Sequence, residues 1–293
     1  MVGLLGTDGI TRSIENLVAK ARALTEEGIT AYALTSAYGY PPITMTGSVE
    51  KDIMMVPPII GVKVAVSDHR SSNPTGEELI RLATAARRAG LLSCTPGLVT
   101  MHDGLWARGD WTPFSTYWIT PTCPPRTCCP PTCTGPRPSS SQGVELVRRG
   151  GFIDFTAGCD DQELEVNADK LAACLSQEGV TADHVTMSSD AYGSQPRFDD
   201  KGECIGLTYA SPKYLHRTIQ GLVKRGMALE EALKLLTTTP ANILGKTGVK
   251  GCVAQGADAD LLVLGEGLAI EGLFARGRTA LWQGETLMKG KFE

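Results

Sequence analysis

The sequence predicts an α/β protein built on an incomplete (β/α)8, TIM-like barrel. Two observations predict this class: apolar, strand-like segments alternate with amphipathic, helix-like segments, and each apolar segment ends on polar residues. A third observation is the change to a two-residue period after Gly251, which is typical of short strands joined by turns. We therefore expect barrel residues over 1–250 and strands of a small β-sandwich over 251–293.

The composition argues against several classes of function. The chain has 293 residues, 42% of them apolar and 20% charged, so it can bury a large core. Its net charge is only −4 and no block of Lys or Arg stands out, so we expect neither a nucleic-acid partner nor a membrane surface. It lacks both a bilayer-length apolar run and a signal-peptide pattern, and we expect a cytoplasmic protein.

The order of apolar segments defines the expected elements. Val2 to Gly6 has the character of an interior strand, so we expect that a preceding first barrel strand is missing. Ser13 and Thr75 begin two helices as N-caps, and Gly28 and Gly90 follow their last apolar turns. Six barrel strands are expected near 2–6, 29–36, 59–66, 97–102, 152–157 and 184–189, and further helices near 164–178, 211–223 and 229–236.

Lys63 lies in the middle of the most apolar strand. The segment 59–66 reads Ile-Ile-Gly-Val-Lys-Val-Ala-Val and has the character of a buried parallel strand. Burial of an ammonium group is unfavourable unless the group is paired, neutralised or modified. Lys63 either extends to solvent or pairs with a carboxylate, or it is carboxylated and bridges two metal ions as an oxygen ligand.

The alternation breaks between residues 106 and 141. This stretch lacks Leu, Val, Lys and Glu, yet it holds three of the four Trp and four of the nine Cys residues. Three interpretations are a disulfide or zinc knot, a disordered Pro-rich linker, and a segment, 103–141, translated out of frame. On the last interpretation, codons for Leu-Leu-Pro-Thr-His-Val read one base late give Cys-Cys-Pro-Pro-Thr, as at 128–132. Because seven prolines lie between 121 and 138, we expect 106–141 to be irregular.

Four motifs carry a family resemblance. The stretches 3–8, 46–52, 60–70 and 188–196 resemble the isoaspartyl (β-aspartyl) dipeptidases of the metal-dependent amidohydrolase superfamily. The resemblance covers residues 1 to about 102 and about 142 to 293. It implies a zinc-dependent metallo-dipeptidase that hydrolyses the isopeptide bond of small isoaspartyl dipeptides, on an amidohydrolase-type barrel in a homo-oligomer.

The same resemblance implies roles for metal-binding and catalytic residues. Lys63, carboxylated, would bridge two Zn ions, and His102 would bind the second of them. Asp190 would bind the first ion and take the proton of the bridging hydroxide. Tyr38 would donate a hydrogen bond to the developing oxyanion. Thr7, Arg70 and Ser194 would bind the carboxylates of the substrate.

Two departures from the family pattern concern the metal ligands. The His-x-His of the first barrel strand is absent, and Cys-Pro-Pro-Thr-Cys stands at 129–133 where the family has Leu-Pro-Thr-His-Val on a sixth strand. His69, His184 and His216 do not replace the lost ligands, because they lie beyond a strand, at a strand start and in a helix. We therefore expect a disrupted sixth strand, weak zinc binding and doubtful activity. The alternatives are a non-catalytic remnant or binding protein, and a dihydroorotase-like amidohydrolase.

Overall fold

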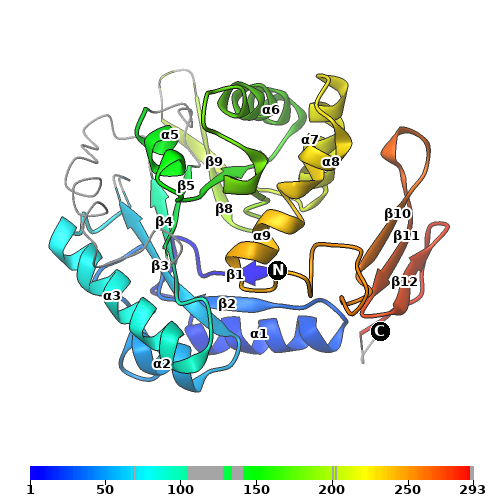
Figure 1. Cartoon of the computed structure of the whole chain (residues 1–293). Coiled ribbons are helices and arrows are strands. Elements are labelled where there is room, and N and C mark those ends of the chain that lie inside the picture. Colours follow the sequence, from blue (N-terminus) through cyan, green and yellow to red (C-terminus); the bar gives the residue numbers. More distant parts are fainter. Residues whose placement is uncertain are drawn as a thin grey trace.

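The computed structural model describes residues 1–66, 68, 70–103, 128–133, 141–199, 201 and 203–290. Its centre is a curved, seven-stranded parallel sheet whose strands lie side by side in chain order, with helices on its outer face (Figure 1). This is an incomplete barrel of the predicted class. The strands are β1 (Val2–Gly3), β2 (Tyr32–Thr35), β3 (Ile59–Val66), β4 (Leu98–Asp103), β5 (Cys128–Cys133), β6 (Ile153–Thr156) and β7 (Val185–Ser188).

The helices begin largely where the sequence predicts. Ser13 caps the first helix by accepting a hydrogen bond from the Asn16 amide, and Thr75 and Glu78 form a capping box on the third. The helices are α1 (Ile14–Glu26), α2 (Val49–Met55), α3 (Gly76–Ser93), α5 (Ser141–Arg148), α6 (Asp161–Leu175), α7 (Lys213–Lys224), α8 (Leu229–Lys234) and α9 (Thr238–Ile243).

Helix α3 does not end at Gly90, as its sequence suggested, but continues to Ser93. Gly90 is buried inside the helix, and a Cβ there would lie 2.8 Å from the Cα of Gly97. The glycine therefore permits a close approach of the helix to the loop that enters β4. The chain turns instead at Cys94, which is left-handed with φ 54°.

The two faces of the sheet differ in chemistry. On β3 and β4, Val62, Val64 and Val99 pack into an apolar core with residues of α1, α2 and α3. Residues alternate between the two faces of a strand, so Lys63 on β3 and His102 on β4 lie on the opposite, inner face. A second apolar core joins β6 and β7 to α5, α6, α7 and α8. A third, smaller apolar cluster contains Leu34, Ile60 and Leu98, with Ile243 of α9 packed against it. The inner face of β3 and β4 thus carries apolar Leu98 as well as the buried polar residues Lys63 and His102.

The expectation that 106–141 is irregular is wrong for residues 128–133. They form β5, which pairs in parallel with β4 on one side and β6 on the other. The register along β4 moves from Thr100↔Cys129 to His102↔Thr132, so two prolines of β5 oppose one residue of β4. A bulge tolerates prolines because its extra residue makes no ladder hydrogen bond. The rest of 106–140 lies outside the described residues.

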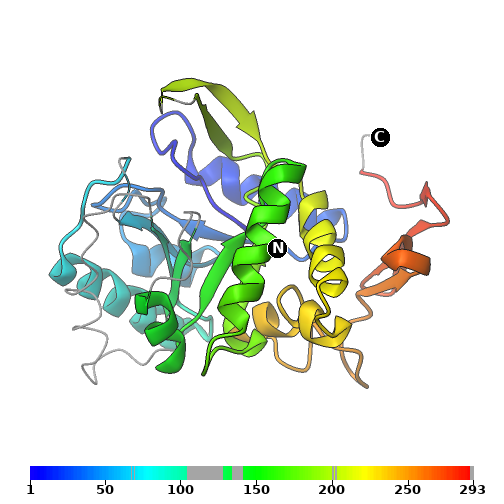
Figure 2. The ribbon, with the colours of Figure 1, turned by 90° about the horizontal axis from the view of Figure 1, so that it is seen from above.

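Two smaller sheets follow the half-barrel. β8 (Ser194–Phe198) and β9 (Cys204–Tyr209) form an antiparallel hairpin, which projects above the sheet in Figure 2. β10 (Leu261–Leu264), β11 (Ile270–Ala275), β12 (Arg278–Trp282) and β13 (Glu285–Thr286) form an antiparallel sheet at one side. Short 3-10 helices span Ala182–His184 and Glu266–Leu268. The division at residue 250 stays a prediction.

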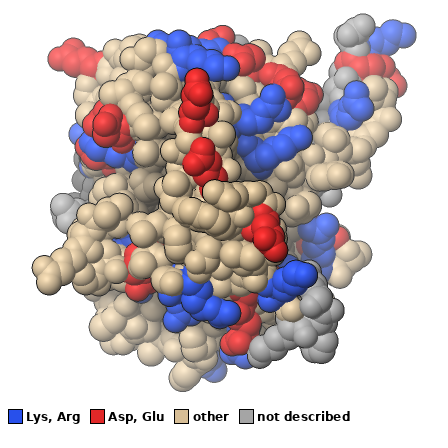
Figure 3. All heavy atoms as spheres, turned by 90° about the vertical axis from the view of Figure 1, so that its right-hand side faces the viewer, with Lys and Arg blue, Asp and Glu red and all other residues tan. Residues whose placement is uncertain are grey.

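Acidic and basic side chains are interspersed on the face shown in Figure 3. Arg225 pairs with Glu165 and Asp169 across α6 and α7, and Arg217 pairs with Asp161. Exposed pairs of this kind contribute little stability each. Within the described residues, no helix combines the length and the apolar character that crossing a bilayer requires.

Candidate active site

The predicted site residues of β2, β3 and β4 meet around the ring of Tyr38. The ring centroid lies 4.7 Å from that of His102, 5.7 Å from Lys63 Nζ and 5.2 Å from Arg70 Cζ. Tyr38 follows β2, and its carbonyl accepts a hydrogen bond from the Ala65 amide of β3 at 3.0 Å. This bond attaches the loop after β2 to the carboxyl end of β3. Barrel enzymes assemble their sites at this end of the strands.

Asp68, which the sequence analysis did not single out, joins two predicted site residues. Its carboxylate accepts from Arg70 Nε and Nη2, both at 2.8 Å, and lies 3.0 Å from His102 Nε2. Burial alone would raise the pKa of Asp68, but the hydrogen bonds from Arg70 and His102 hold it well below its usual range. An ionised carboxylate only accepts hydrogen bonds, so His102 Nε2 carries the proton and Nδ1 the lone pair.

Lys63 is 2% exposed, so its predicted burial is confirmed. Burial lowers the pKa of Lys63 to about 8, although the negative charges of Asp190 and Asp154 act to raise it. Burial is the main cause of the raised pKa of Tyr38, and the charge of Asp190 raises it further. Asp190 therefore lies close enough to Lys63 and Tyr38 for its charge to act on both. Its backbone is left-handed, with φ 45°, a conformation that Asp tolerates.

Asp154 on β6 is a second carboxylate that the sequence analysis missed. It accepts hydrogen bonds from Thr186 Oγ1 and Ser188 Oγ of β7, both at 2.6 Å. Burial raises the pKa of Asp154, while these hydrogen bonds and Lys63 oppose the rise. The two-residue alternation of Phe152-Ile-Asp-Phe could have predicted that Asp154 lies on the inner face of the sheet. Asp68 offered no such signal, because its partners come from another strand and from its own loop.

Two predicted residues are not brought into this cluster by the described contacts. Thr7 is exposed in a turn after β1. Ser194 begins β8, where its backbone pairs with Tyr209, and its side chain lies outside the described residues. Their predicted roles in binding substrate carboxylates stay predictions.

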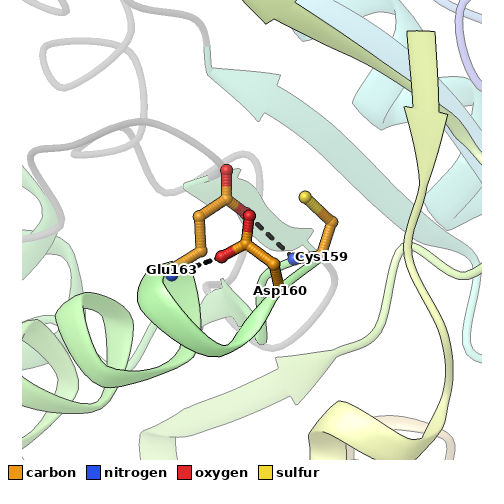
Figure 4. A group of neighbouring side chains, drawn as sticks. All are labelled: Cys159, Asp160 and Glu163. Carbon is orange, nitrogen blue, oxygen red and sulfur yellow. Dashed lines mark hydrogen bonds between the residues drawn. The ribbon is translucent and has the colours of Figure 1, made fainter.

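A separate group, Cys159, Asp160 and Glu163, has its ligand atoms within 4.8 Å of one another (Figure 4). Asp160 caps α6 by accepting from the Glu163 amide, and Glu163 accepts from the Cys159 amide, both at 2.9 Å. Burial raises the pKa of the Cys159 thiol to about 11, so the thiol is protonated at neutral pH and is a poor metal ligand. The group is a helix cap.

The described residues do not fit a two-zinc centre. A catalytic zinc site takes three protein ligands and keeps one position open. The predicted ligands are Lys63, His102 and Asp190, three donors for two ions, while the carboxylates of Asp68 and Asp154 are engaged in hydrogen bonds to other side chains. Within the part of the chain that the structure describes, no three His, Cys, Asp or Glu ligand atoms gather there. Thr132 of β5 lies in register with both His102 and Asp154, at the position where the family pattern has a histidine.

Comparison with known proteins shows to which family the chain belongs. The profile of the amidohydrolase family matches residues 130–280. A β-aspartyl dipeptidase from Fervidobacterium islandicum AW-1, crystallised with a β-Asp-Leu dipeptide, shares 38% identity with a TM-score of 0.89. The match covers 100% of this chain and 77% of that chain. A second structure of β-aspartyl dipeptidase from the same organism shares 34% identity over 100% of this chain and 75% of that one, with a TM-score of 0.82.

A more distant structure shares the fold alone. N-acetylglucosamine-6-phosphate deacetylase from Pasteurella multocida matches with a TM-score of 0.62 at 13% identity, over 95% of this chain and 75% of that chain. The family profile and the two β-aspartyl dipeptidase structures show that the chain is a hydrolase of the amidohydrolase family, a family that is generally metal-dependent. Within it, the chain belongs to the β-aspartyl dipeptidases.

Proposed function

We propose that the mouth around Tyr38 binds β-aspartyl dipeptides and is built for zinc-dependent hydrolysis of their isopeptide bond. The observation that carries the proposal is the Arg70–Asp68–His102 network against Tyr38, in a chain 38% identical to a protein crystallised with β-Asp-Leu. The network fixes one edge of the Arg70 guanidinium. The Arg70 side chain remains 31% exposed, and this part is available to a substrate carboxylate.

Tyr38 and Asp190 supply the remaining groups of the proposed reaction. Burial raises the pKa of Tyr38, so its phenol keeps the proton at neutral pH and donates to the carbonyl oxygen as negative charge develops there. Asp190, whose charge is felt by both Lys63 and Tyr38, accepts the proton of the attacking water and passes it to the leaving amine.

The metal centre is the part of the family's chemistry that the described residues leave incomplete. We propose that the chain as written holds zinc weakly, and that Lys63 remains largely an unmodified amine without the ions that stabilise its carboxylation. We propose no step through the metal for this chain. For the chain as written we therefore propose binding of the dipeptide without turnover, and we propose hydrolysis for a chain with a complete ligand set, because an intact arginine–carboxylate network lies beside an incomplete ligand set.

Calorimetric titration with β-Asp-Leu tests the binding proposal. We expect the wild-type chain to bind, and Arg70→Ala to weaken binding at least about tenfold, or about 1.4 kcal/mol, because a charge-assisted contact is lost. Arg81→Ala is the matched control, since Arg81 lies on the outside of α3 in an exposed pair with Glu77. A folded wild-type chain without affinity for β-Asp-Leu, or equal losses in both variants, would contradict the proposal.

Turnover of the same dipeptide with added zinc separates the two candidate functions. Hydrolysis above background assigns a dipeptidase. Binding without hydrolysis assigns a binding protein.

A further inference from the structure

One of the four family motifs, residues 46–52, contributes no residue to the site described above. It begins helix α2, which Ser48 caps by accepting a hydrogen bond from the Lys51 amide at 3.2 Å. The motif ends at Asp52, which lies on α2 and has no exposed surface. Burial of a carboxylate is unfavourable unless hydrogen bonds compensate for the lost water. The hydrogen-bond partners of Asp52 therefore indicate what the motif does.

Four donors from two separate segments converge on the Asp52 carboxylate. Oδ2 accepts from the hydroxyl of Thr35 at the end of β2 and, at 3.0 Å, from the Met45 amide. Oδ1 accepts from the amide of Thr46 at 2.8 Å and from its hydroxyl at 2.6 Å. We refer to residues 36–48, between β2 and α2, as the β2–α2 connection. Asp52 joins the two ends of this connection.

Tyr38 lies within the β2–α2 connection, three residues after Thr35. Between these two residues, Ser36 is buried and left-handed, with φ 70°. A left-handed residue other than glycine is strained, and it persists only where the surrounding structure holds it. Asp52 holds the chain directly before this strained residue, through its hydrogen bond with Thr35.

Two further hydrogen bonds hold the middle of the connection. The Tyr38 carbonyl accepts from the Ala65 amide, and the Tyr40 amide donates to Ser72 Oγ at 2.7 Å. These bonds attach the connection to β3 and to the loop that follows it. They do not reach its ends, which Asp52 holds instead. The backbone that carries the Tyr38 ring is therefore fixed from two sides.

We propose that Asp52 is a positioning residue for Tyr38. By holding both ends of the β2–α2 connection, its carboxylate orients the Tyr38 ring against His102 and Arg70. Asp52 does not touch the dipeptide, because it lies on α2, which packs on the outer face of the sheet. The inference rests on the proposed function, in which Tyr38 contacts the dipeptide.

Asp52→Asn tests the proposal because it keeps the shape of the side chain and removes one acceptor atom. In either orientation, the new NH2 group faces a backbone amide, that of Met45 or that of Thr46, which then loses its acceptor. We expect the Tyr38 ring to lose its fixed orientation. Fluorine NMR of a chain labelled with fluorotyrosine measures this, with the Tyr38 resonance assigned by Tyr38→Phe. We expect Asp52→Asn to move this resonance toward that of an exposed tyrosine.

Thr35→Val and Thr239→Val are a matched pair that separates positioning from stability. Both threonines have no exposed surface, and both hydroxyls donate a hydrogen bond, to Asp52 and to the Ala182 carbonyl respectively. Both variants should lower the melting temperature, but only Thr35→Val should move the Tyr38 resonance. Thr35→Val also provides the milder change of the same anchor if Asp52→Asn does not fold. Equal changes of the resonance in both threonine variants would overturn the proposal.

A double-mutant cycle on β-Asp-Leu affinity connects the orientation of Tyr38 with its use. We expect Asp52→Asn to weaken binding at least about threefold, within the range for coupled residues, and to have no further effect in Tyr38→Ala. Equal losses with and without the Tyr38 ring overturn the proposal. So does a Tyr38 resonance that Asp52→Asn leaves unchanged. A wild-type chain that does not bind the dipeptide contradicts the proposed function, and the Tyr38 resonance then decides the positioning role by itself.

Discussion

β3 and β5 lie in the same sheet on the two sides of β4, yet different factors determine that each is a strand. All eight residues of β3 are buried, and the strand pairs with β4 without interruption from Gly61 to Val66. β5 contains two prolines, its register with β4 is interrupted, and it pairs with β6 at only two positions. Every local feature of β3 favours a strand. β5 is a strand because it pairs with the edges of β4 and β6, which would otherwise be left without a partner strand on that side.

At this mouth, the position of the backbone and the chemistry of the side chains are set independently. Flanking strands can hold the β5 backbone in place although its sequence is not typical of a strand. They cannot supply the side chain that the family pattern has at position 132. A strand can therefore complete the sheet while the metal ligands stay incomplete.

Gly61→Ala should be severely destabilising. A Cβ at Gly61 would lie 2.7 Å from the Cβ of Leu98 on the neighbouring strand β4. We expect a loss of about 3 kcal/mol or more in the free energy of unfolding, measured by urea denaturation. The control is Gly206→Ala on β9, where an added Cβ meets nothing within 4 Å. Equal effects at both glycines would show that β3 is not tightly packed.

Asp68→Asn should affect both stability and substrate binding. The neutral amide cannot accept from Arg70 and His102 as a carboxylate does, so we expect a loss of about 2 kcal/mol in unfolding free energy. We also expect at least about tenfold weaker binding of β-Asp-Leu, because Arg70 loses its fixed orientation. Asp161→Asn is the control, since Asp161 forms an exposed pair with Arg217. Unchanged dipeptide affinity in Asp68→Asn would remove the network from the substrate site.

Thr132→His should improve zinc binding. Position 132 is in register with His102, so an imidazole there adds a donor beside an existing one. We expect zinc affinity to rise at least about tenfold, measured by competition with a chelator. Thr35→His is not a useful control, because Thr35 is buried against Asp52. Thr247→His, at an exposed position beyond α9, is suitable and should not change zinc affinity.

Pro131→Val should have the smallest effect. Residues 130 and 131 lie at the interruption of the β4–β5 register, where the strand needs no ladder hydrogen bond from its own amide. We expect a change of less than about 1 kcal/mol in unfolding free energy, the span of strand preferences. A larger stabilisation would mean that the prolines hold β5 in a strained position between its neighbours.

Most of the fold was predictable because local signals agreed with one another. The apolar period, the caps at Ser13 and Thr75 and the polar strand ends all indicated the same alternation of strands and helices. β5 was not predictable, since prolines argue against a strand and only the edges of β4 and β6 overcome that preference. The end of α3 was misplaced because Gly90 serves packing against Gly97, where a helix end was expected.

The burial of one candidate site residue was predictable, because that residue is unusual for its place in the chain. A lysine inside an apolar strand, Lys63, indicated chemistry before any partner was known. The alternation along β6 could have placed Asp154 on the inner face, but the hydrogen bonds of Asp68 to His102 and of Asp154 to Thr186 join different strands, which the sequence order does not show. Thr7 and Ser194 were predicted by resemblance alone, and the described contacts do not bring them to the mouth.

The most direct test of the central claim measures zinc content and β-Asp-Leu turnover together, on the purified chain as written. The claim is that the mouth holds the residues for substrate binding but too few donors for two zinc ions. We predict substoichiometric zinc by atomic emission after gel filtration and no turnover above background, with Thr132→His retaining more zinc than the wild-type chain. Two tightly held zinc ions per chain, together with rapid hydrolysis of the dipeptide, would contradict the claim.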